Sequence, residues 1–190
     1  MAQVWLASAA KEAAATDCQR ARDICGAYDF VFDACANGQQ LKCLAVIDEY
    51  TREALAIDVA GSIRSTRVIE VLSRLVTVHG APRYLRSDNG PEFVSRAIPK
   101  WLTEANIDTA FIDPGKSWLK GMSQSFNGKF RDECLNMQWF KNRIDAKVLI
   151  EDFRRHFNET CPHSSLGNLT PAEFKQRLST TNSDRAISEA

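Results

Sequence analysis

The 190-residue sequence has no excess of charge of either sign and no long apolar run. Its 24 Lys and Arg residues are balanced by 24 Asp and Glu residues, which argues against a protein that binds nucleic acid through overall charge alone. No stretch reaches the length of about eighteen apolar residues that a membrane-spanning helix needs. Residues 1–10 lack the basic region of a signal peptide, so we expect a cytoplasmic protein with no membrane partner.

Disulfide and zinc-binding patterns are also missing. The six cysteines form no C-x-x-C pair and their spacings match no zinc site, so we expect reduced thiols. Apolar residues make up 44% and charged residues 25% of the chain, values near the average of globular proteins. This length suits one domain with a hydrophobic core of its own.

The periodicity of the apolar residues predicts a succession of strands and helices. Five segments are predicted as strands from their β-branched and aromatic residues: 28–35, 41–50, 54–59, 84–87 and 109–112. Four segments are predicted as helices from the spacing of their apolar residues: 65–79, 95–105, 121–139 and 146–157. A fifth helix over 171–178 is predicted from Thr170 as N-cap and Pro171 at the first helical position. The order of these elements predicts an α/β fold with a mixed five-stranded sheet flanked by helices.

We expect the folded core to span residues 27–178. The pair Asn37-Gly38 predicts a hairpin turn between the first two strands. Residues 1–26 differ from the rest and form a divergent N-terminal segment, whereas residues 179–190 are a polar tail that we expect to fray.

Two acids stand at positions that favour a functional site. Alternation along the first strand puts Asp29, Val31 and Asp33 on one face. An acid inside a central strand is costly unless it is paired or binds a metal; the alternative is an edge-exposed acid or a partner for an Arg. Asp88 ends a predicted strand before Gly90-Pro91, where it is either functional or an acid that only shapes the loop.

Phosphodiester chemistry gives a reason to join these positions. Two divalent ions about 3.5–4 Å apart can stabilise the attacking and leaving oxygens of an in-line displacement. Mg²⁺ prefers hard oxygen ligands, usually one or two carboxylates. Asp29, Asp88 and a residue on the helix that begins at Gly121 could converge on such a site.

The sequence resembles a known family over about residues 28–175. Five segments carry the resemblance: AYDFVFDA (27–34), VIDEYTRE (46–53), RSDNGPEF (86–93), SFNGKFRDECLN (125–136) and PHSSLG-x-x-TPAEF (162–174). They resemble the catalytic core of bacterial insertion-sequence transposases of the DDE type, which are related to retroviral integrases and share the RNase H-like fold. The resemblance implies a metal-dependent polynucleotidyl transferase that uses Mg²⁺ or Mn²⁺ and acts on transposon-end and target DNA.

The resemblance assigns catalytic positions to Asp29, Asp88 and Gln124, with Asp29 and Asp88 as metal ligands. Thirty-five residues separate Asp88 from Gln124. The family has Glu where this chain has Gln124, so the third acidic position carries a neutral amide. Other departures are Ser117-Trp-Leu-Lys-Gly121 before the helix, Cys161 in place of Arg, and the lack of an upstream helix-turn-helix region.

These departures leave three hypotheses for the function. The first is a truncated transposase core for DNA strand cleavage and transfer, catalytically impaired by Gln124. The second is a transposase that is still active, and the third is a non-catalytic DNA- or transposase-binding regulator. As partners we expect DNA and either a second copy or an intact transposase, with association to the nucleoid when DNA is bound.

Basic and amide side chains near Gln124 are candidates for contacts to DNA phosphates. They lie on or beside one predicted helix face, opposite an apolar stripe, and are Lys120, Asn127, Lys129 and Arg131. Such contacts contribute salt-dependent affinity through counterion release. The alternative for each of them is a charge or amide that only increases solubility.

Overall fold

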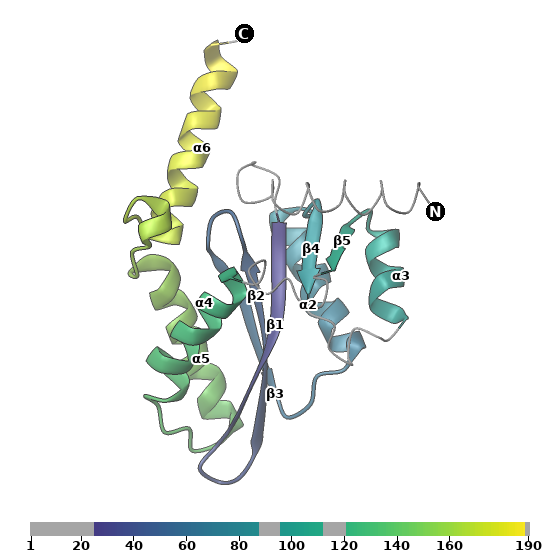
Figure 1. Ribbon diagram of the computed structural model, residues 1–190, viewed down its shortest axis with the longest axis vertical. Helices are drawn as coiled ribbons and strands as arrows, with labels where there is room; N and C mark the ends of the chain where they lie inside the picture. The colour runs from purple at the N-terminus through teal and green to yellow at the C-terminus, as the bar shows by residue number, and fades with distance from the viewer. Residues whose placement is uncertain (1–24, 88–95, 112–120, 189–190) are drawn as a thin grey trace.

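The computed structural model describes residues 25–87, 96–111 and 121–188. It contains a five-stranded sheet with the strand order β3-β2-β1-β4-β5 (Figure 1). The strands are β1 (Cys25–Ala34), β2 (Gln40–Asp48), β3 (Ala54–Ala60), β4 (Tyr84–Ser87) and β5 (Asp108–Phe111). The first three pair antiparallel, while β4 runs parallel to both β1 and β5, so the predicted mixed sheet is confirmed.

Helices cover both faces of this sheet. The helices are α2 (Ser65–His79), α3 (Ala97–Glu104), α4 (Gly121–Phe130), α5 (Arg143–Glu159) and α6 (Pro171–Ser188), with a π-helical turn η2 (Arg131–Leu135) and a 3₁₀ turn η3 (Ser164–Leu166). Figure 1 shows α4 and α5 on one side of the strands and α2 and α3 on the other, with α6 projecting away from the sheet. None of the helices that the structure describes combines the length and the apolarity that a membrane span requires.

Two hydrophobic clusters fill the space between the sheet and its helices. One contains Val31 of β1 with Phe126 and Phe130 of α4 and Phe153 of α5. The other contains Tyr28 of β1 with buried residues of α2 and α3. The predicted alternation along β1 is therefore confirmed, and odd-numbered positions of β1 face α4 and α5.

The predicted helix over 121–139 is shorter than expected. The α-helix ends at Phe130 and is followed by the π-helical turn, in which Cys134 is buried. A π turn holds more residues per turn than an α-helix, so it rotates the residues that follow away from the apolar stripe. Met137 and Trp139, which were expected inside that helix, are 74% and 80% exposed.

Helix α6 is longer than expected. It runs to Ser188, although the apolar pattern ends at Leu178 and residues 179–190 were predicted to fray. After Pro171 at its first position, no Gly or Pro interrupts the chain up to Ser188, and capping at Thr170 supports its start.

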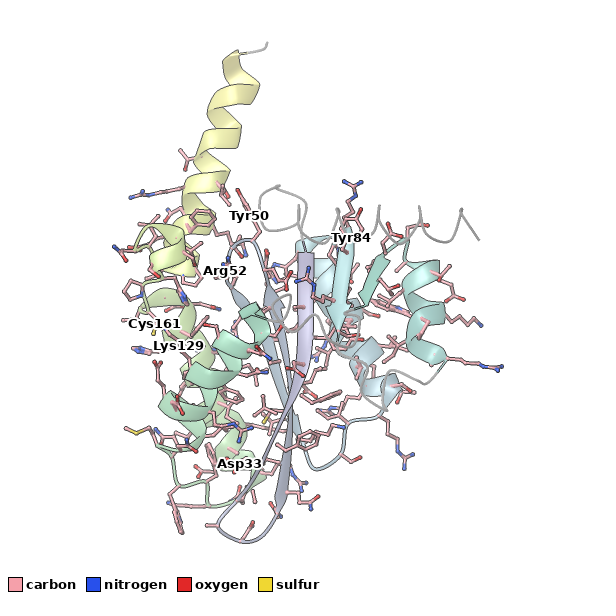
Figure 2. The ribbon with its side chains drawn as sticks, viewed as in Figure 1. Asp33, Tyr50, Arg52, Tyr84, Lys129 and Cys161 are labelled. Atoms are coloured by element: carbon pink, nitrogen blue, oxygen red, sulfur yellow. The ribbon has the colours of Figure 1, made fainter. Side chains whose placement is uncertain are left out.

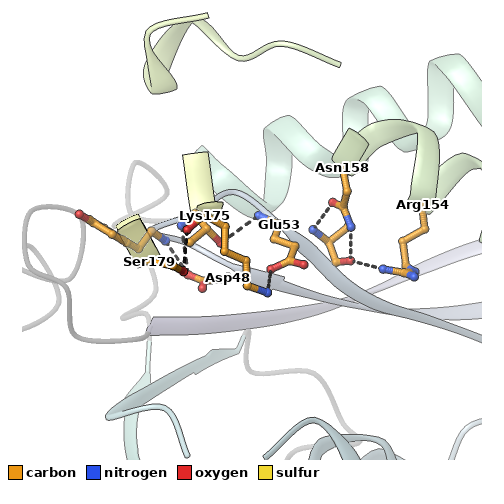
Figure 3. A network of polar contacts seen from close by, with 9 residues as sticks. Asp48, Glu53, Arg154, Asn158, Lys175 and Ser179 are labelled. Carbon is orange, nitrogen blue, oxygen red and sulfur yellow. Dashed lines mark hydrogen bonds and ion pairs between the residues drawn. The ribbon is translucent and has the colours of Figure 1, made fainter. Parts of the chain in front are cut away.

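A polar network holds the turn between β2 and β3 (Figure 3). The Asn158 side chain accepts from the Ala54 amide at 2.8 Å and donates to the Ala54 carbonyl at 3.0 Å. Arg154 also donates to that carbonyl at 2.9 Å, and Lys175 of α6 pairs with Glu53 at 2.6 Å. Helices α5 and α6 thus fix the conformation of this turn from outside the sheet.

Candidate functional site

Asp29 lies in the central strand of the sheet, on the face covered by α4. Its Oδ2 accepts a hydrogen bond of 2.7 Å from Nδ2 of Asn127, and its Oδ1 accepts one of 2.8 Å from the Phe30 amide. The Asp29 side chain is half-buried. Both carboxylate oxygens are therefore oriented by the protein, and one of them is held by the helix that carries Gln124.

Gln124 lies three residues before Asn127 on α4 and is exposed. Residues three apart on an α-helix are neighbours on its surface. Because Asn127 contacts Asp29, the helix face that carries Gln124 lies next to the central strand. The role of Gln124 as the third position of a catalytic site stays a prediction.

Asp88, the second predicted catalytic residue, lies outside the described residues. It directly follows Ser87, which is 8% exposed and whose Cα pairs with that of Tyr28, the residue before Asp29. The role of Asp88 stays a prediction. The same holds for Lys120, which also lies outside the described part of the chain.

The donor atoms around Asp29 suit a divalent cation with hard character. Asp29 supplies a carboxylate, and Oδ1 of Asn127 is a buried oxygen without a hydrogen-bond partner. Carboxylate and amide oxygens are the ligands that Mg²⁺ and Mn²⁺ prefer. Within the described ranges, no group of three or more His, Cys, Asp or Glu residues forms a metal site by itself.

The remaining candidates for contacts to DNA differ in their surroundings. Asn127 was grouped with the exposed face of its helix, but it is half-buried and bound to Asp29, so it positions a predicted metal ligand. Lys129 is partly buried, with its Nζ 5.9 Å from the centre of the Phe157 ring. Arg131 is exposed on the π-helical turn. Whether these residues bind DNA remains a prediction.

A buried ion pair supports the end of β4. Nη1 of Arg86 lies 3.0 Å from Oε1 of Glu49, and the two side chains are 2% and 1% exposed. The pair ties β4, two residues before Asp88, to the turn after β2. Arg86 lies in the motif RSDNGPEF and Glu49 in the motif VIDEYTRE, but nothing in the sequence pattern links the two segments.

Arg52 and His163 are two further basic residues, and neither is predicted from sequence to belong to the site. Burial lowers the pKa of the Arg52 guanidinium, and the carboxylates of Glu49 and Asp48 act in the opposite direction. Burial also lowers the pKa of His163, and the charges of Lys129 and Arg52 lower it further. Both lie within segments that carry the family resemblance, which was the only signal that could have drawn attention to them.

Comparisons with known proteins show which families and relatives this chain is similar to. Two family models described as integrase core domain match residues 26–117 and 105–171. An uncharacterized protein of insertion element IS476 from Xanthomonas euvesicatoria is 44% identical over 159 residues, and one of IS407 from Burkholderia multivorans is 43% identical over 146 residues. These matches cover 84% and 77% of this chain but only 46% and 53% of the two relatives, so the chain spans about half their length.

Solved structures show the same fold. The HTLV-2 integrase catalytic core domain, solved in complex with magnesium, matches with a TM-score of 0.60 at 14% identity over 80% of this chain and 95% of that one. The BIV integrase catalytic core domain matches with a TM-score of 0.61 at 13% identity, covering 84% of this chain and 98% of that one. The chain therefore belongs to the insertion-sequence transposases that carry an integrase core domain with the RNase H-like fold.

Proposed function

We propose that this chain is a catalytic core for DNA strand cleavage and transfer in transposition, and that Gln124 leaves this activity impaired. The hydrogen bond between Asn127 and Asp29 supports the proposal, because it holds the Gln124 face of α4 against the central strand. The ligands would be the ends of an insertion sequence and a target duplex, which would associate the protein with the nucleoid.

Asp29 and Asp88 would hold Mg²⁺ or Mn²⁺ in this core. When bound, such an ion would stabilise charge that develops on the phosphate oxygens. The chain itself orients Asp29, through Asn127 on one carboxylate oxygen and the Phe30 amide on the other. Asp88 suits the second ligand position, because its neighbour Ser87 pairs in register with the residue before Asp29.

Gln124 removes one negative charge from this arrangement. The amide has nearly the size of the family's Glu, so the fold accommodates it, but its neutral oxygen is a weaker ligand for Mg²⁺ than a carboxylate. Glu133 is not expected to replace it, because it lies nine positions further on and is exposed on the π-helical turn η2. We therefore expect weak binding of one metal ion and little or no strand transfer.

The test compares the unaltered chain with Gln124→Glu in cleavage of a labelled duplex that carries the terminal repeats of the element, with Mg²⁺ or Mn²⁺. We expect Gln124→Glu to cleave and the unaltered chain to cleave little or not at all. The double variant Gln124→Glu with Asp29→Asn controls for contaminating nucleases. Robust cleavage by the unaltered chain would overturn the impairment and favour an active transposase.

A second candidate function is a non-catalytic regulator that binds DNA or joins oligomers of an intact transposase. The neutral Gln124 on a core with the integrase fold favours it, because such a core would keep its binding surfaces without the third acid. Co-purification of this chain with an intact transposase of the same family tests this alternative. Failure to associate, together with cleavage by the unaltered chain, would exclude it.

A further inference from the structure

Three basic side chains from separate elements form a cluster on the α4 and α5 side of the sheet. Arg52 comes from the β2–β3 turn, Lys129 from α4 and His163 from the segment between α5 and η3. Figure 2 shows Arg52 and Lys129 on the same side of the molecule. Lys129 and His163 both lie against the ring of Phe157, and the charges of Lys129 and Arg52 lower the pKa of His163. We call Arg52, Lys129 and His163 the basic cluster.

Arg52 is held in an unusual conformation with unused donors. Its φ of 65° lies in the left-handed region, which non-glycine residues adopt rarely. Its Nε and Nη1 atoms are buried and have no hydrogen-bond partner. The network of Asn158, Arg154 and Lys175 holds the neighbouring residues Glu53 and Ala54 in the same turn.

His163 and Lys129 both lie against the ring of Phe157. The His163 ring contacts Phe157 edge to face with centroids 4.9 Å apart, and the Lys129 Nζ lies 5.9 Å from the same ring. The Nε2 atom of His163 is buried without a hydrogen-bond partner. Buried polar atoms without partners are rare in proteins, and a bound ion can supply the partner that such an atom lacks.

The nearest carboxylates are engaged elsewhere. Oδ1 of Asp48 accepts from the Tyr50 and Thr51 amides at 2.8 Å and 3.3 Å, which shapes the turn. Oε1 of Glu49 pairs with Arg86 at 3.0 Å. The charges of Glu49 and Asp48 act on Arg52, but its Nε and Nη1 atoms have no hydrogen-bond partner. The cluster therefore combines positive charge with donors that lack an acceptor.

We infer that the basic cluster is a binding site for one phosphate group of the DNA backbone. A phosphodiester carries a permanent negative charge and two free acceptor oxygens, which match a guanidinium and a neighbouring ring nitrogen. Arg is suited to this role because its planar donors fit phosphate geometry. The inference rests on the proposed function for its ligand, and it adds Arg52 and His163 to the contacts that were predicted from sequence.

The test measures binding of a fluorescently labelled DNA duplex to the full chain by anisotropy, without divalent metal and over a series of salt concentrations. The variants are Arg52→Asn, which tolerates a positive φ, and Lys129→Gln. One bound phosphate accounts for a change of about 0.9 in the slope of log K against log salt. We therefore expect this reduction in the variant that carries both changes, and a smaller reduction with up to about tenfold weaker binding at low salt in each single variant. His163→Gln should weaken binding without this change of slope if the imidazole is neutral.

The matched control is Arg155→Gln, which removes the same charge from a side chain that is 64% exposed on α5. Its salt slope should stay near that of the unaltered chain. Circular dichroism of each variant confirms folding, and Lys129→Gln keeps the test decisive if Arg52→Asn does not fold. If Arg52→Asn and Lys129→Gln leave the affinity for DNA unchanged, the basic cluster does not bind phosphate, and the proposed function still stands.

Two other outcomes also decide the question. If the unaltered chain binds no DNA at all, both the phosphate-binding site and the proposed function are wrong. If the variants change the association of protein copies in light scattering but not the affinity for DNA, the occupant is a carboxylate of another chain, and the inference is wrong.

Discussion

Asn127 joins α4 to Asp29 on the central strand through a hydrogen bond of 2.7 Å between residues 98 positions apart. This contact does two things at once. It fixes one carboxylate oxygen of a predicted metal ligand, and it adds a polar contact to the packing of Phe126 and Phe130 of α4 against the sheet. Gln124 lies three residues before Asn127 on the same helix and is exposed.

Replacing Asn127 should therefore affect metal binding at Asp29 more than the formation of helix α4. We expect Asn127→Ala to cost about 1.5–3 kcal/mol of stability for the lost hydrogen bond to a charged group. In the Gln124→Glu background it should also weaken Mn²⁺ binding, measured by calorimetry, because Asp29 loses its orientation. The control Gly128→Ala changes the next residue, whose new Cβ meets nothing within 4 Å.

Gly128→Ala should stabilise the chain by about 0.5–1 kcal/mol, since Gly within a helix costs that much relative to Ala. Urea denaturation measures both variants. Equal metal affinity for Asn127→Ala and its background would show that Asn127 has only a packing role.

The ion pair between Arg86 and Glu49 predicts a large effect of a small change. Glu49→Gln keeps the shape of the side chain and removes the negative charge beside a guanidinium that is 2% exposed. Breaking a buried ion pair on one side costs about 3–5 kcal/mol. We expect a loss in this range in urea denaturation, and a smaller one when Arg86→Met is added. A loss below about 1 kcal/mol, as for surface pairs, would contradict this account.

Local sequence patterns predicted most of the elements and some of their ends. The boundaries of α2 and β4 match the predicted ones at 65–79 and 84–87. Helix α2 ends at Gly80, whose φ of 87° is open to Gly alone among common residues. These ends are encoded by nearby residues, so a single sequence is sufficient to find them.

The parts that were missed depend on contacts over long distances in the sequence. The π-helical turn after Phe130 buries Cys134 and Leu135, and no propensity scale reports it. The bond from Asn127 to Asp29 and the unpartnered donors of Arg52 and His163 appear only when the elements are assembled. Periodicity places a residue on a face, but it does not say which residue of another element it meets.

Asn158 holds the β2–β3 turn, so we expect its replacement to lower the free energy of unfolding although it is remote from Gln124. It is 6% exposed and bonds to both the amide and the carbonyl of Ala54. Asn158→Leu leaves a buried amide without an acceptor, at a cost of about 1–3 kcal/mol. Urea denaturation should show this loss, with Arg155→Gln as a surface control near zero. Since the same turn carries Arg52, the variant should also weaken DNA binding; unchanged affinity would show that the turn stays in place without Asn158.

The pH dependence of stability provides the last prediction. The pKa of His163 is lowered from its ordinary value of 6.5, chiefly by burial and then by Lys129 and Arg52. The unfolded chain therefore binds a proton more readily than the folded one below that value, and the free energy of unfolding falls as the pH drops through the folded pKa. The pKa of Glu151 is lowered from 4.5, mainly by its hydrogen bond to Arg154, so its contribution is lost only in more acidic solution.

Two separate steps should consequently appear in a series of denaturation curves from neutral to acidic pH. His163→Gln should remove the step just below the ordinary pKa of His and leave the acidic one, because Gln cannot take up the proton. Glu151→Gln should do the reverse. If His163→Gln loses as much stability as the unaltered chain over the upper step, the imidazole is not the group that titrates there, and the burial of His163 against Phe157 has no consequence for acid stability.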